Sequence, residues 1–561
     1  MIQDVYDPLE KYRDEFKENF SRLAREKYEE LAEKSGVDIS ANRKTIKELK
    51  SAEETARAEK TKLFFKGLLI FALIAGAAAA GYFAYSRGAT QQGVLSGAAC
   101  AACLVCLYFA FKFYSKTSKF IDELKFKIRM LERVAWAQMQ PLNELYTWDI
   151  PVKLIEKTVP RLAFDPYFTA SRLSDLKRQF GWSDSFNEGK SILFAQSGAI
   201  NGNAFALGEY VEQKWGSKTY YGYKTIHWTE WQTGSDGKRH LVSRSQTLKA
   251  ELTKPIPIYP KEKILIYGND AAPNLSFSRK PSSLSNGSGM INSMRKKMEL
   301  RRLKKFSQNL DDDSQYTLMS NHEFETLFHA KDRTNEVEFR LLFTALAQTQ
   351  ILRLMKDTSI GYGDDFAFTK RGKINMLFPA HLTGAPIDTD PARFRSFDFD
   401  AAKSFFLSFN EKYFKDVYFA FAPILSIPLY QQTRTHEDIY KEATGAAASF
   451  WELEAIANFH GEEKFRHPQS ATQAILKASR VGGEGEVEIT AYSYKGERRV
   501  EYVSVFGGDG RLHSVAVEWV EYLPISKTSK ISVSEAAGNQ APPKKFAGRS
   551  ILRRGIYSML G

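Results

Sequence analysis

Two histidines, seven positions apart, are the side chains of this sequence that best suit a metal ion. They are His460 and His467, and Glu452 and Glu454 precede them. Imidazole and carboxylate groups bind zinc or manganese. Histidines that share a metal from one helix face, however, stand three or four positions apart. We therefore interpret this segment as a polar loop between two helices, and we predict neither a metal nor a cofactor.

Carboxylates gather in a second segment, between residues 361 and 400. Aspartates there surround Arg393 and Arg395, and they could coordinate a divalent cation. Helix caps, turns and surface ion pairs explain such residues more simply. A membrane-tethered hydrolase with a carboxylate or histidine site here or around 452–467 stays open as the alternative function. The aspartates are Asp364, Asp365, Asp388, Asp390, Asp398 and Asp400.

Known catalytic motifs are missing from the sequence. It contains no phosphate-binding GxxxxGK[ST] loop, no HExxH zinc motif and no GxSxG nucleophile elbow. The glycine-rich segment 482–485 precedes a predicted strand, whereas a dinucleotide-binding motif follows a strand and begins a helix. We interpret this segment as a turn. The sequence leans towards a protein without enzymatic activity.

Two apolar segments are the most informative elements of the chain. Residues 63–85 and 93–114 are each long enough to cross a bilayer, because a helix rises about 1.5 Å per residue and the hydrocarbon core is about 30 Å thick. The short polar loop Ser86–Gln92 joins them, and neither carries a charge in its middle. A charged region of roughly 60 residues precedes them, unlike a cleavable signal peptide. We predict a transmembrane hairpin; an oligomeric channel is a weaker alternative.

Flanking cations give the expected orientation. Lysines lie at the outer end of each segment, whereas the loop carries only Arg87. Because positive residues are retained in the cytoplasm, we predict a multi-pass protein of the inner membrane with both termini cytoplasmic. The lysines are Lys60, Lys62, Lys66, Lys112, Lys116 and Lys119.

All three cysteines, Cys100, Cys103 and Cys106, lie in the second apolar segment. Their spacing could suggest a metal or acylation site, but buried cysteine behaves as a small hydrophobic residue, and we predict packing. No cysteine is left for a disulfide elsewhere, which agrees with a reducing cytoplasm. Small residues at four-residue spacing permit close approach within the hairpin or between copies in a homo-oligomer. They include Ala77 with Gly81, Ala80 with Ala84, and Gly97 with Ala101.

A net charge of +13 and a pI near 9.2 point to anionic partners. In a membrane protein this bias favours anionic lipid head groups over nucleic acid. The densest cationic run is 295–305, and Ile291, Met294 and Met298 could share one face of a helix there. Such a helix could lie on an anionic membrane, bind RNA phosphates or a partner, or simply be solvated. Its candidate anion-binding residues are Arg295, Lys296, Lys297, Arg301, Arg302, Lys304 and Lys305.

Periodicity predicts the remaining elements. Residues 1–60 and 116–185 read as helices with apolar stripes, interrupted at Ser35–Gly36. The β-branched and aromatic segments 191–196, 204–214, 219–232, 239–251 and 261–267 predict an antiparallel β domain with a turn at 234–237. We further expect helices over 335–356, 399–416, 450–459 and 470–479. Strands are expected over 366–368, 374–378 and 417–430, and as a meander over 486–494, 498–506 and 512–522.

The predicted fold class is α+β. An N-terminal helical stalk and a two-helix transmembrane hairpin precede antiparallel β-rich and mixed α+β cytoplasmic domains. The expected divisions are a charged helical arm (1–60), the hairpin (61–115), a helical stalk (116–185), a β domain (186–275), a basic linker (276–320), an α+β domain (321–432), helices with a three-stranded meander (433–527) and a disordered basic tail (528–561).

Residues 60–430 resemble a bacterial two-span membrane family known as domain of unknown function 3137. The resemblance rests on Phe324–His329, on the Glu-Val-Glu-Phe-Arg segment 336–340 with Leu341 and Leu342, and on two spans placed before a β-rich part. It implies membrane anchoring, no established activity, and a LemA-type membrane protein as a possible partner. We therefore predict a binding or scaffolding protein at the cytoplasmic face of the inner membrane.

Overall fold

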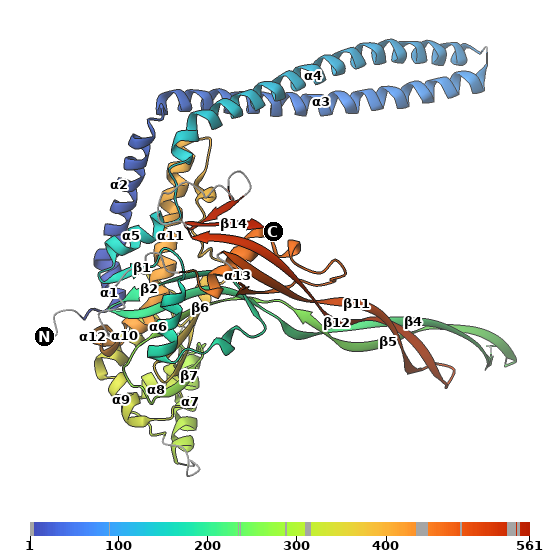
Figure 1. Ribbon diagram of the computed structural model, residues 1–561. Coiled ribbons are helices and arrows are strands. Elements are labelled where there is room, and N and C mark those ends of the chain that lie inside the picture. Colours follow the sequence, from blue (N-terminus) through green and yellow to red (C-terminus); the bar gives the residue numbers. More distant parts are fainter. Residues whose placement is uncertain are drawn as a thin grey trace. The chain divides into compact units, whose positions relative to one another are not determined.

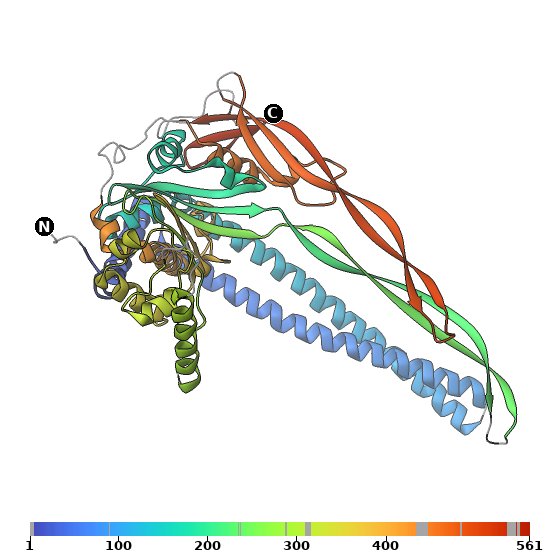
Figure 2. The ribbon, with the colours of Figure 1, turned by 90° about the horizontal axis from the view of Figure 1, so that it is seen from below.

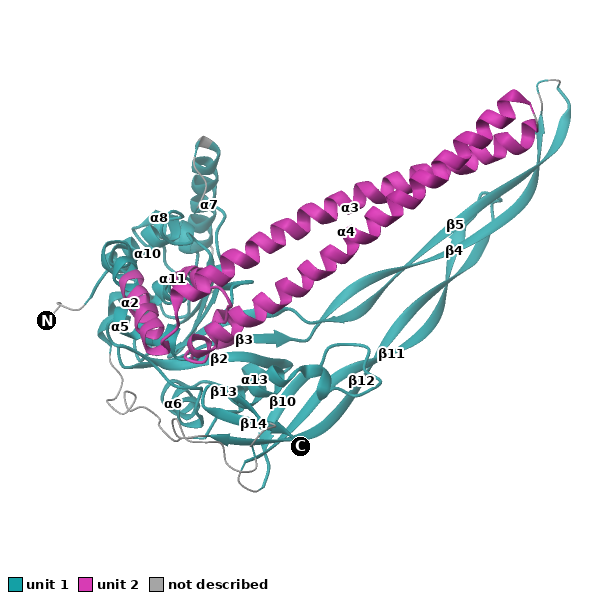
Figure 3. Ribbon diagram, turned by 90° about the horizontal axis from the view of Figure 1, so that it is seen from above, with its two compact units in different colours: residues 1–20, 148–389, 412–561 teal, residues 21–147, 390–411 magenta. Residues whose placement is uncertain are grey.

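The computed structural model describes residues 5–88, 90–233, 235, 237–285, 289–308, 316–433, 447–482, 485–535, 546 and 550–561 (Figure 1). These residues form two compact units (Figure 3). Unit 1 contains residues 1–20, 148–389 and 412–561, and unit 2 contains residues 21–147 and 390–411. The described fold mixes long helices with antiparallel sheets, which confirms the α+β class.

Unit 2 is built on a long helical hairpin. Helices α3 (Ile39–Arg87) and α4 (Gln91–Asn143) lie side by side (Figure 3). Asp38 begins α3 by accepting a hydrogen bond from the Ala41 amide, and Gly36, with φ +62°, separates α3 from α2 (Lys17–Ser35) as the sequence predicts. The connection is shorter than the predicted 86–92, because α3 continues to Arg87 and α4 begins at Gln91.

The base of this hairpin holds residues 390–411 of the same unit. The buried Asn42 side chain accepts a hydrogen bond from the Phe399 amide at 3.0 Å and donates one to the Phe397 carbonyl at 2.9 Å. Gln138 of α4 donates to Thr45 of α3 at 3.1 Å. Residues 390–411 thus pack with the two helical arms. The prediction of a helical stalk over 116–185 needs correction, because α4 ends at Asn143 and residues 148–185 belong to unit 1, where they include a strand over Leu162–Phe164.

The N-terminal apolar stripe is buried within unit 1. Helix α1 (Pro8–Lys11) and the π-helical turn η1 (Tyr12–Phe16) pack on the C-terminal part of α11 (Phe399–Leu425). Phe20 stacks on Phe414 with ring centroids 4.3 Å apart. The stripe that the sequence shows thus has a partner about 400 residues away, which no local pattern could reveal.

Unit 1 contains a seven-stranded antiparallel sheet in the order β1-β2-β3-β6-β9-β8-β7. Its strands come from both sides of the expected boundaries at 275 and 320. The predicted strands near 191, 204, 261, 366 and 374 are confirmed. The bounds are β1 Leu162–Phe164, β2 Lys190–Ile200, β3 Asn203–Glu212, β6 Lys261–Gly268, β7 Ser276–Arg279, β8 Phe366–Arg371 and β9 Ile374–Pro379.

Helices cover this sheet and complete its core. Trp451 of α13 (Phe450–His460) packs with Leu176 of α6 (Ala170–Phe180) and with Ile264 of β6. Each of these side chains is nearly inaccessible, so their burial supplies much of the apolar stabilisation. Other helices of the unit are α5 Ile150–Thr158, α7 Met290–Gln308, α8 His322–Phe328, α9 Glu336–Leu342, α10 Ala345–Lys356 and α12 Pro428–Gln432.

One helix prediction and one strand prediction need correction. The expected helix 335–356 is divided into α9 and α10, because Thr344 caps α10 by accepting a hydrogen bond from the Ala347 amide while Phe343 leaves the helical conformation. The expected strand 417–430 is helical, since α11 continues to Leu425 and α12 follows. Residues 417–427 are buried on every side, and such an apolar run does not distinguish a strand from a buried helix.

A five-stranded sheet in the order β10-β11-β12-β14-β13 corrects several predictions for the C-terminal part. Strand β10 (Ile475–Arg480) replaces an expected helix. The meander is one hairpin, because β11 (Glu486–Phe506) continues through the expected turn at 495–497 to the turn at 507–510. The expected disordered tail contains the end of β12 (Leu512–Glu535), β13 (Ile551–Arg553) and β14 (Ile556–Leu560). Residues 536–545 and 547–549 of that tail lie outside the described chain.

Two long hairpins of unit 1 pack together and form what we call the β arm (Figures 1 and 2). Strands β4 (Lys214–Thr233) and β5 (Arg239–Ile258) pair over their whole length, and β11 pairs with β12. Gly237 of the predicted β4–β5 turn has φ +74°, while Gly234 and Asp236 lie outside the described residues. Ile226, Leu248, Ala250, Val515 and Val517 are buried between the hairpins.

Candidate membrane anchor and cationic helix

The apolar segments of α3 and α4 are exposed. Each helix contains a window of 18 residues with mean hydropathy 2.1 or 2.2, and none of either window is buried. Both helices are therefore long and apolar enough to cross a membrane, and unlike core helices they present these side chains outward. Soluble proteins rarely expose apolar surface on this scale. The side chains at least 60% exposed are Phe64, Phe65, Phe71, Tyr82, Tyr85, Val94, Leu95, Tyr108, Phe111 and Phe113.

Small residues line the contact between the two apolar segments. The Cys100 sulfur lies 3.4 Å from the Ala77 carbonyl oxygen. A Cβ placed on Gly81 would lie 3.7 Å from the same sulfur, and one on Gly76 would lie 3.8 Å from the Cys103 sulfur. Cys100 and Cys103 thus occupy packing positions against α3, whereas Cys106 is exposed.

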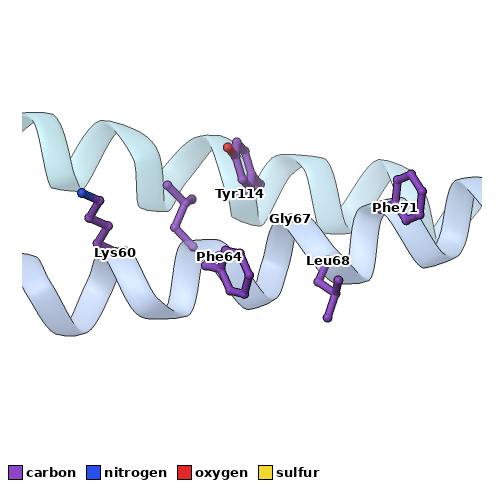
Figure 4. A pocket seen from close by; sticks show the side chains of 7 residues that line it. Lys60, Phe64, Gly67, Leu68, Phe71 and Tyr114 are labelled. Atoms are coloured by element: carbon purple, nitrogen blue, oxygen red, sulfur yellow. The ribbon is translucent and has the colours of Figure 1, made fainter. Parts of the chain in front are cut away.

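A shallow groove lies between α3 and α4 where the first apolar segment begins (Figure 4). Its volume is about 450 Å³, and Leu63, Phe64, Leu68 and Phe71 form most of its wall. Lys60 and Tyr114 supply its polar side-chain atoms, and the described residues that line it include no pair of groups suited to acid–base or nucleophilic chemistry. The groove suits an apolar chain better than a polar substrate.

Cations mark the end of the hairpin that lies away from its turn. Lys66 donates a hydrogen bond across the hairpin to Thr117 at 2.6 Å, and Lys62 pairs with Glu59 at 2.7 Å. At the turn, Arg87 is the single cation, and it contacts Gln92. The hairpin is therefore asymmetric in charge, with an apolar distal half and a cationic proximal boundary.

The predicted cationic helix forms as α7. Its Leu303 side chain is fully buried, and Glu299 binds His329 at 3.0 Å and Lys331 at 3.4 Å, which fixes one face of α7 against unit 1. Lys296 is partly buried and lies 3.8 Å from Glu323. The remaining candidate cations are exposed, and they are Arg295, Lys297, Arg301, Arg302, Lys304 and Lys305.

The two candidate metal histidines have separate hydrogen-bond partners. His460 is buried and its Nε2 lies 2.8 Å from the Ser558 hydroxyl, whereas His467 accepts a hydrogen bond from the Gln469 amide. Glu452 and Glu454, upstream of them, bind other groups. Within the described ranges, no three His, Cys, Asp or Glu side chains converge to hold a metal ion.

Glu452 is the acceptor of a buried ionic cluster that joins the C-terminal strands to α13. Arg553 lies 3.0 Å and Arg554 3.2 Å from its two oxygens, and all three side chains are at most 3% exposed. Arg554 also donates to the Gln196 side chain at 2.6 Å. These arginines lie in the segment that was predicted to be disordered, so the sequence analysis missed them. Apolar residues around them, such as Ile556, are the feature of the sequence that indicates an ordered segment there.

The six candidate aspartates are distributed over both units. Asp364 and Asp365 belong to unit 1, where Asp364 forms a fully buried ion pair with Arg279 at 2.6 Å and Asp365 accepts a hydrogen bond from the His381 amide at 3.0 Å. Asp388 is also in unit 1 and half-buried. In unit 2, Asp390 and Asp398 accept hydrogen bonds from the amides of Ala392 and Ala401, and Asp400 pairs with Arg43. Structural pairing and capping account for the five aspartates with these contacts.

Two further buried groups escaped sequence reasoning. Lys370 donates to the carbonyl oxygens of Ala271 at 3.0 Å and Gly372 at 2.6 Å, and burial lowers its pKa to about 7. His381 stacks on Tyr362 with ring centroids 4.2 Å apart, and its Nε2 lies 2.9 Å from the Asp416 carbonyl oxygen. A carbonyl oxygen only accepts, so this nitrogen carries a proton. Backbone carbonyl groups and aromatic rings surround both side chains, and we therefore interpret them as residues that stabilise the fold.

Comparison of the chain with protein-family models, with curated proteins and with solved structures finds no match. The family resemblance of residues 60–430 therefore stays a prediction.

Proposed function

We propose that this chain is an integral protein of the bacterial inner membrane that binds or organises partners at the cytoplasmic face. Residues 63–85 and 93–114 would be its two spans. The observation that carries the proposal is the exposure of two apolar helix windows in unit 2. A bilayer is the environment in which such surfaces are stable, because lipid tails then replace water around them.

The charge asymmetry of the hairpin supports the proposed orientation. The lysines lie at the end of the apolar segments away from the turn, and the turn itself carries Arg87 alone. Under the positive-inside rule the turn would face the periplasm, and both helical arms would stay in the cytoplasm with the domains that follow them.

The residues of unit 1 support a binding role more than a tethered hydrolase. Its most suggestive carboxylates, Glu452 and Asp364, are neutralised by buried arginines. A catalytic carboxylate must reach substrate, and these do not reach the surface. The expected partners, a LemA-type membrane protein and further copies of this chain, stay predictions.

Alkaline extraction of cell membranes tests the anchoring. We expect the full chain to remain in the membrane pellet, because two apolar spans resist extraction that releases peripheral proteins. A variant with Ile74→Arg and Leu104→Arg, two exposed side chains at the middle of the apolar segments, should be released or degraded, since each charge near a bilayer centre costs about 3 kcal/mol. Thr55→Arg, at an exposed position of α3 outside the apolar segments, is the matched control and should stay in the pellet. Release of the wild-type chain would refute the proposal.

A further inference from the structure

The outward face of α7 carries apolar side chains in water. Ile291, Met294 and Met298 lie within about 60° of one another around the helix axis. They are 71%, 60% and 53% exposed. Residues of this size and spacing are normally buried, and on α7 the buried side is the opposite one, where Leu303 packs into unit 1.

Cations continue the same face and flank it. Arg302 and Lys305 follow the apolar group along the outward face, and Arg295 and Arg301 lie on its two sides. The Arg302 side chain is 76% exposed and has a single weak pairing with Glu299 at 3.3 Å. Among the described residues, no carboxylate lies within ion-pair distance of Arg295, Arg301 or Lys305. Within the described part of the chain, the weak pair between Arg302 and Glu299 is therefore the one ion pair that opposes the positive charge of this face.

The fixed side of α7 keeps this face directed outward. Glu299 contacts His329 and Lys331, and Lys296 lies 3.8 Å from Glu323 of α8. Figure 3 shows α7 beside α8, with one end of α7 projecting from the neighbouring helices. Ile291, Met294 and Met298 stay more than half exposed beside the described residues of unit 1.

The mixture of side chains distinguishes lipid from RNA. Phosphate binding alone needs cations, and single-stranded nucleic acid adds aromatic side chains on which bases stack. The outward face of α7 carries an isoleucine and two methionines, whereas Phe306, the exposed aromatic side chain of this helix, packs edge-on against Tyr316. Aliphatic side chains that enter the acyl region, with cations at head-group level, are typical of helices that lie in an anionic membrane surface.

We infer that α7 is a second membrane contact of this protein, which lies on a leaflet containing anionic lipid with Ile291, Met294 and Met298 inserted and with Arg302 and Lys305 on the head groups. The inference rests on the proposed function only in placing unit 1 beside a bilayer. Unlike the α3–α4 hairpin, this contact depends on lipid charge and on salt, because exposed charges are screened.

An environment-sensitive probe on α7 tests the inference in the full chain. Cys100, Cys103 and Cys106 are replaced by Ala, Met294→Cys is labelled with a nitrobenzoxadiazole dye, and the protein is reconstituted into vesicles. In vesicles that contain phosphatidylglycerol we expect a blue-shifted, brighter emission than in pure phosphatidylcholine, and high salt should reverse the shift. Ser293→Cys, exposed on the same helix but about 140° from Met298, is the matched label position and should change little.

Charge reversal distinguishes the effect of the cations on this face from the effect of the total charge of the chain. Arg302→Glu with Lys305→Glu should abolish the shift at Met294, whereas Arg178→Glu with Arg371→Glu, at exposed positions elsewhere in unit 1, should keep it. Equal emission in both lipids, equal shifts at Met294 and Ser293, or a shift produced in phosphatidylcholine vesicles by a single-stranded RNA oligonucleotide would each overturn the inference. The labelled chain must remain in the vesicles after alkaline extraction; failure there refutes the hairpin anchor instead.

Discussion

Glu454 is a carboxyl group enclosed between α13 and β2. It accepts hydrogen bonds from the Asn187 side chain at 2.9 Å and from the Ile192 amide at 3.0 Å, and Lys477 lies 3.3 Å away. Burial raises the pKa of Glu454 to about 7, and Lys477 only partly opposes this effect. The proton on this group therefore matters for stability at ordinary pH.

The raised pKa of Glu454 predicts a pH-dependent stability. Between its ordinary pKa of 4.5 and about 7, the folded chain keeps a proton that the unfolded chain has lost, so raising the pH favours unfolding. We expect the wild type to lose about 3 kcal/mol relative to Glu454→Gln across this window, because glutamine does not titrate. Urea unfolding of the detergent-solubilised protein at several pH values, followed by near-ultraviolet circular dichroism, measures the difference.

Glu486→Gln is the matched control for this experiment. Glu486 is an exposed carboxylate that pairs with Lys530 on the neighbouring strand, and its replacement should follow the wild type at every pH. A difference between the wild type and Glu454→Gln that stays constant from pH of about 4 to about 8 would contradict the prediction.

At the residue scale, sequence reasoning found the types of residue and missed their partners. It interpreted His460 and His467 as loop residues; His460 in fact ends α13 and reaches Ser558 of β14. Arg553 and Arg554 bind Glu452 across about 100 residues of sequence, and no periodic pattern records such a contact. The methionines of α7 were recognisable because they share a face of a single helix.

At the element scale, Gly222 controls the packing of the β arm. A Cβ at this position would collide with the Ala516 carbonyl oxygen of the other hairpin and would lie 2.9 Å from Val517 Cγ2. We expect Gly222→Val to separate the hairpins at a cost of about 1–3 kcal/mol, although valine favours strands. Hydrogen exchange followed by mass spectrometry should show lost protection in β4, β5 and the start of β12.

The matched control is Thr225→Val, which places the same side chain on the exposed face of the same strand. It should leave exchange in the β arm unchanged. Unaltered exchange in Gly222→Val would mean that the hairpins do not need this close approach.

The elements also show why some sequence predictions succeeded. Long periodic segments, such as α3 and α4, were predicted with their N-cap Asp38 and the break at Gly36. Glycine was misleading at Gly496, which was expected in a turn; a Cβ there would lie 3.0 Å from Val520 Cγ1, so this glycine permits close packing within a continuous strand. The buried helix 417–425 looked like a strand because its apolar residues lack a period.

At the scale of the whole molecule, chain segments distant in sequence combine. Residues 390–411 complete unit 2, and the seven-stranded sheet of unit 1 joins strands from residues 162 to 379. The domains predicted from the sequence are continuous residue ranges, whereas each unit combines several separate ranges. The apolar hairpin is different, because its function as a membrane anchor would depend on local composition and on flanking charge alone.

We propose that this hairpin crosses the inner membrane with its turn outside, and the accessibility of single cysteines in intact spheroplasts measures that orientation. In a chain whose native cysteines are replaced by Ala, Thr90→Cys lies at the turn and Ser51→Cys lies on the exposed side of the proximal part of α3. We predict that a membrane-impermeant maleimide labels Thr90→Cys in intact spheroplasts and labels Ser51→Cys only after lysis. Labelling of Ser51→Cys before lysis, or of neither position without detergent while both react with it, would contradict the account.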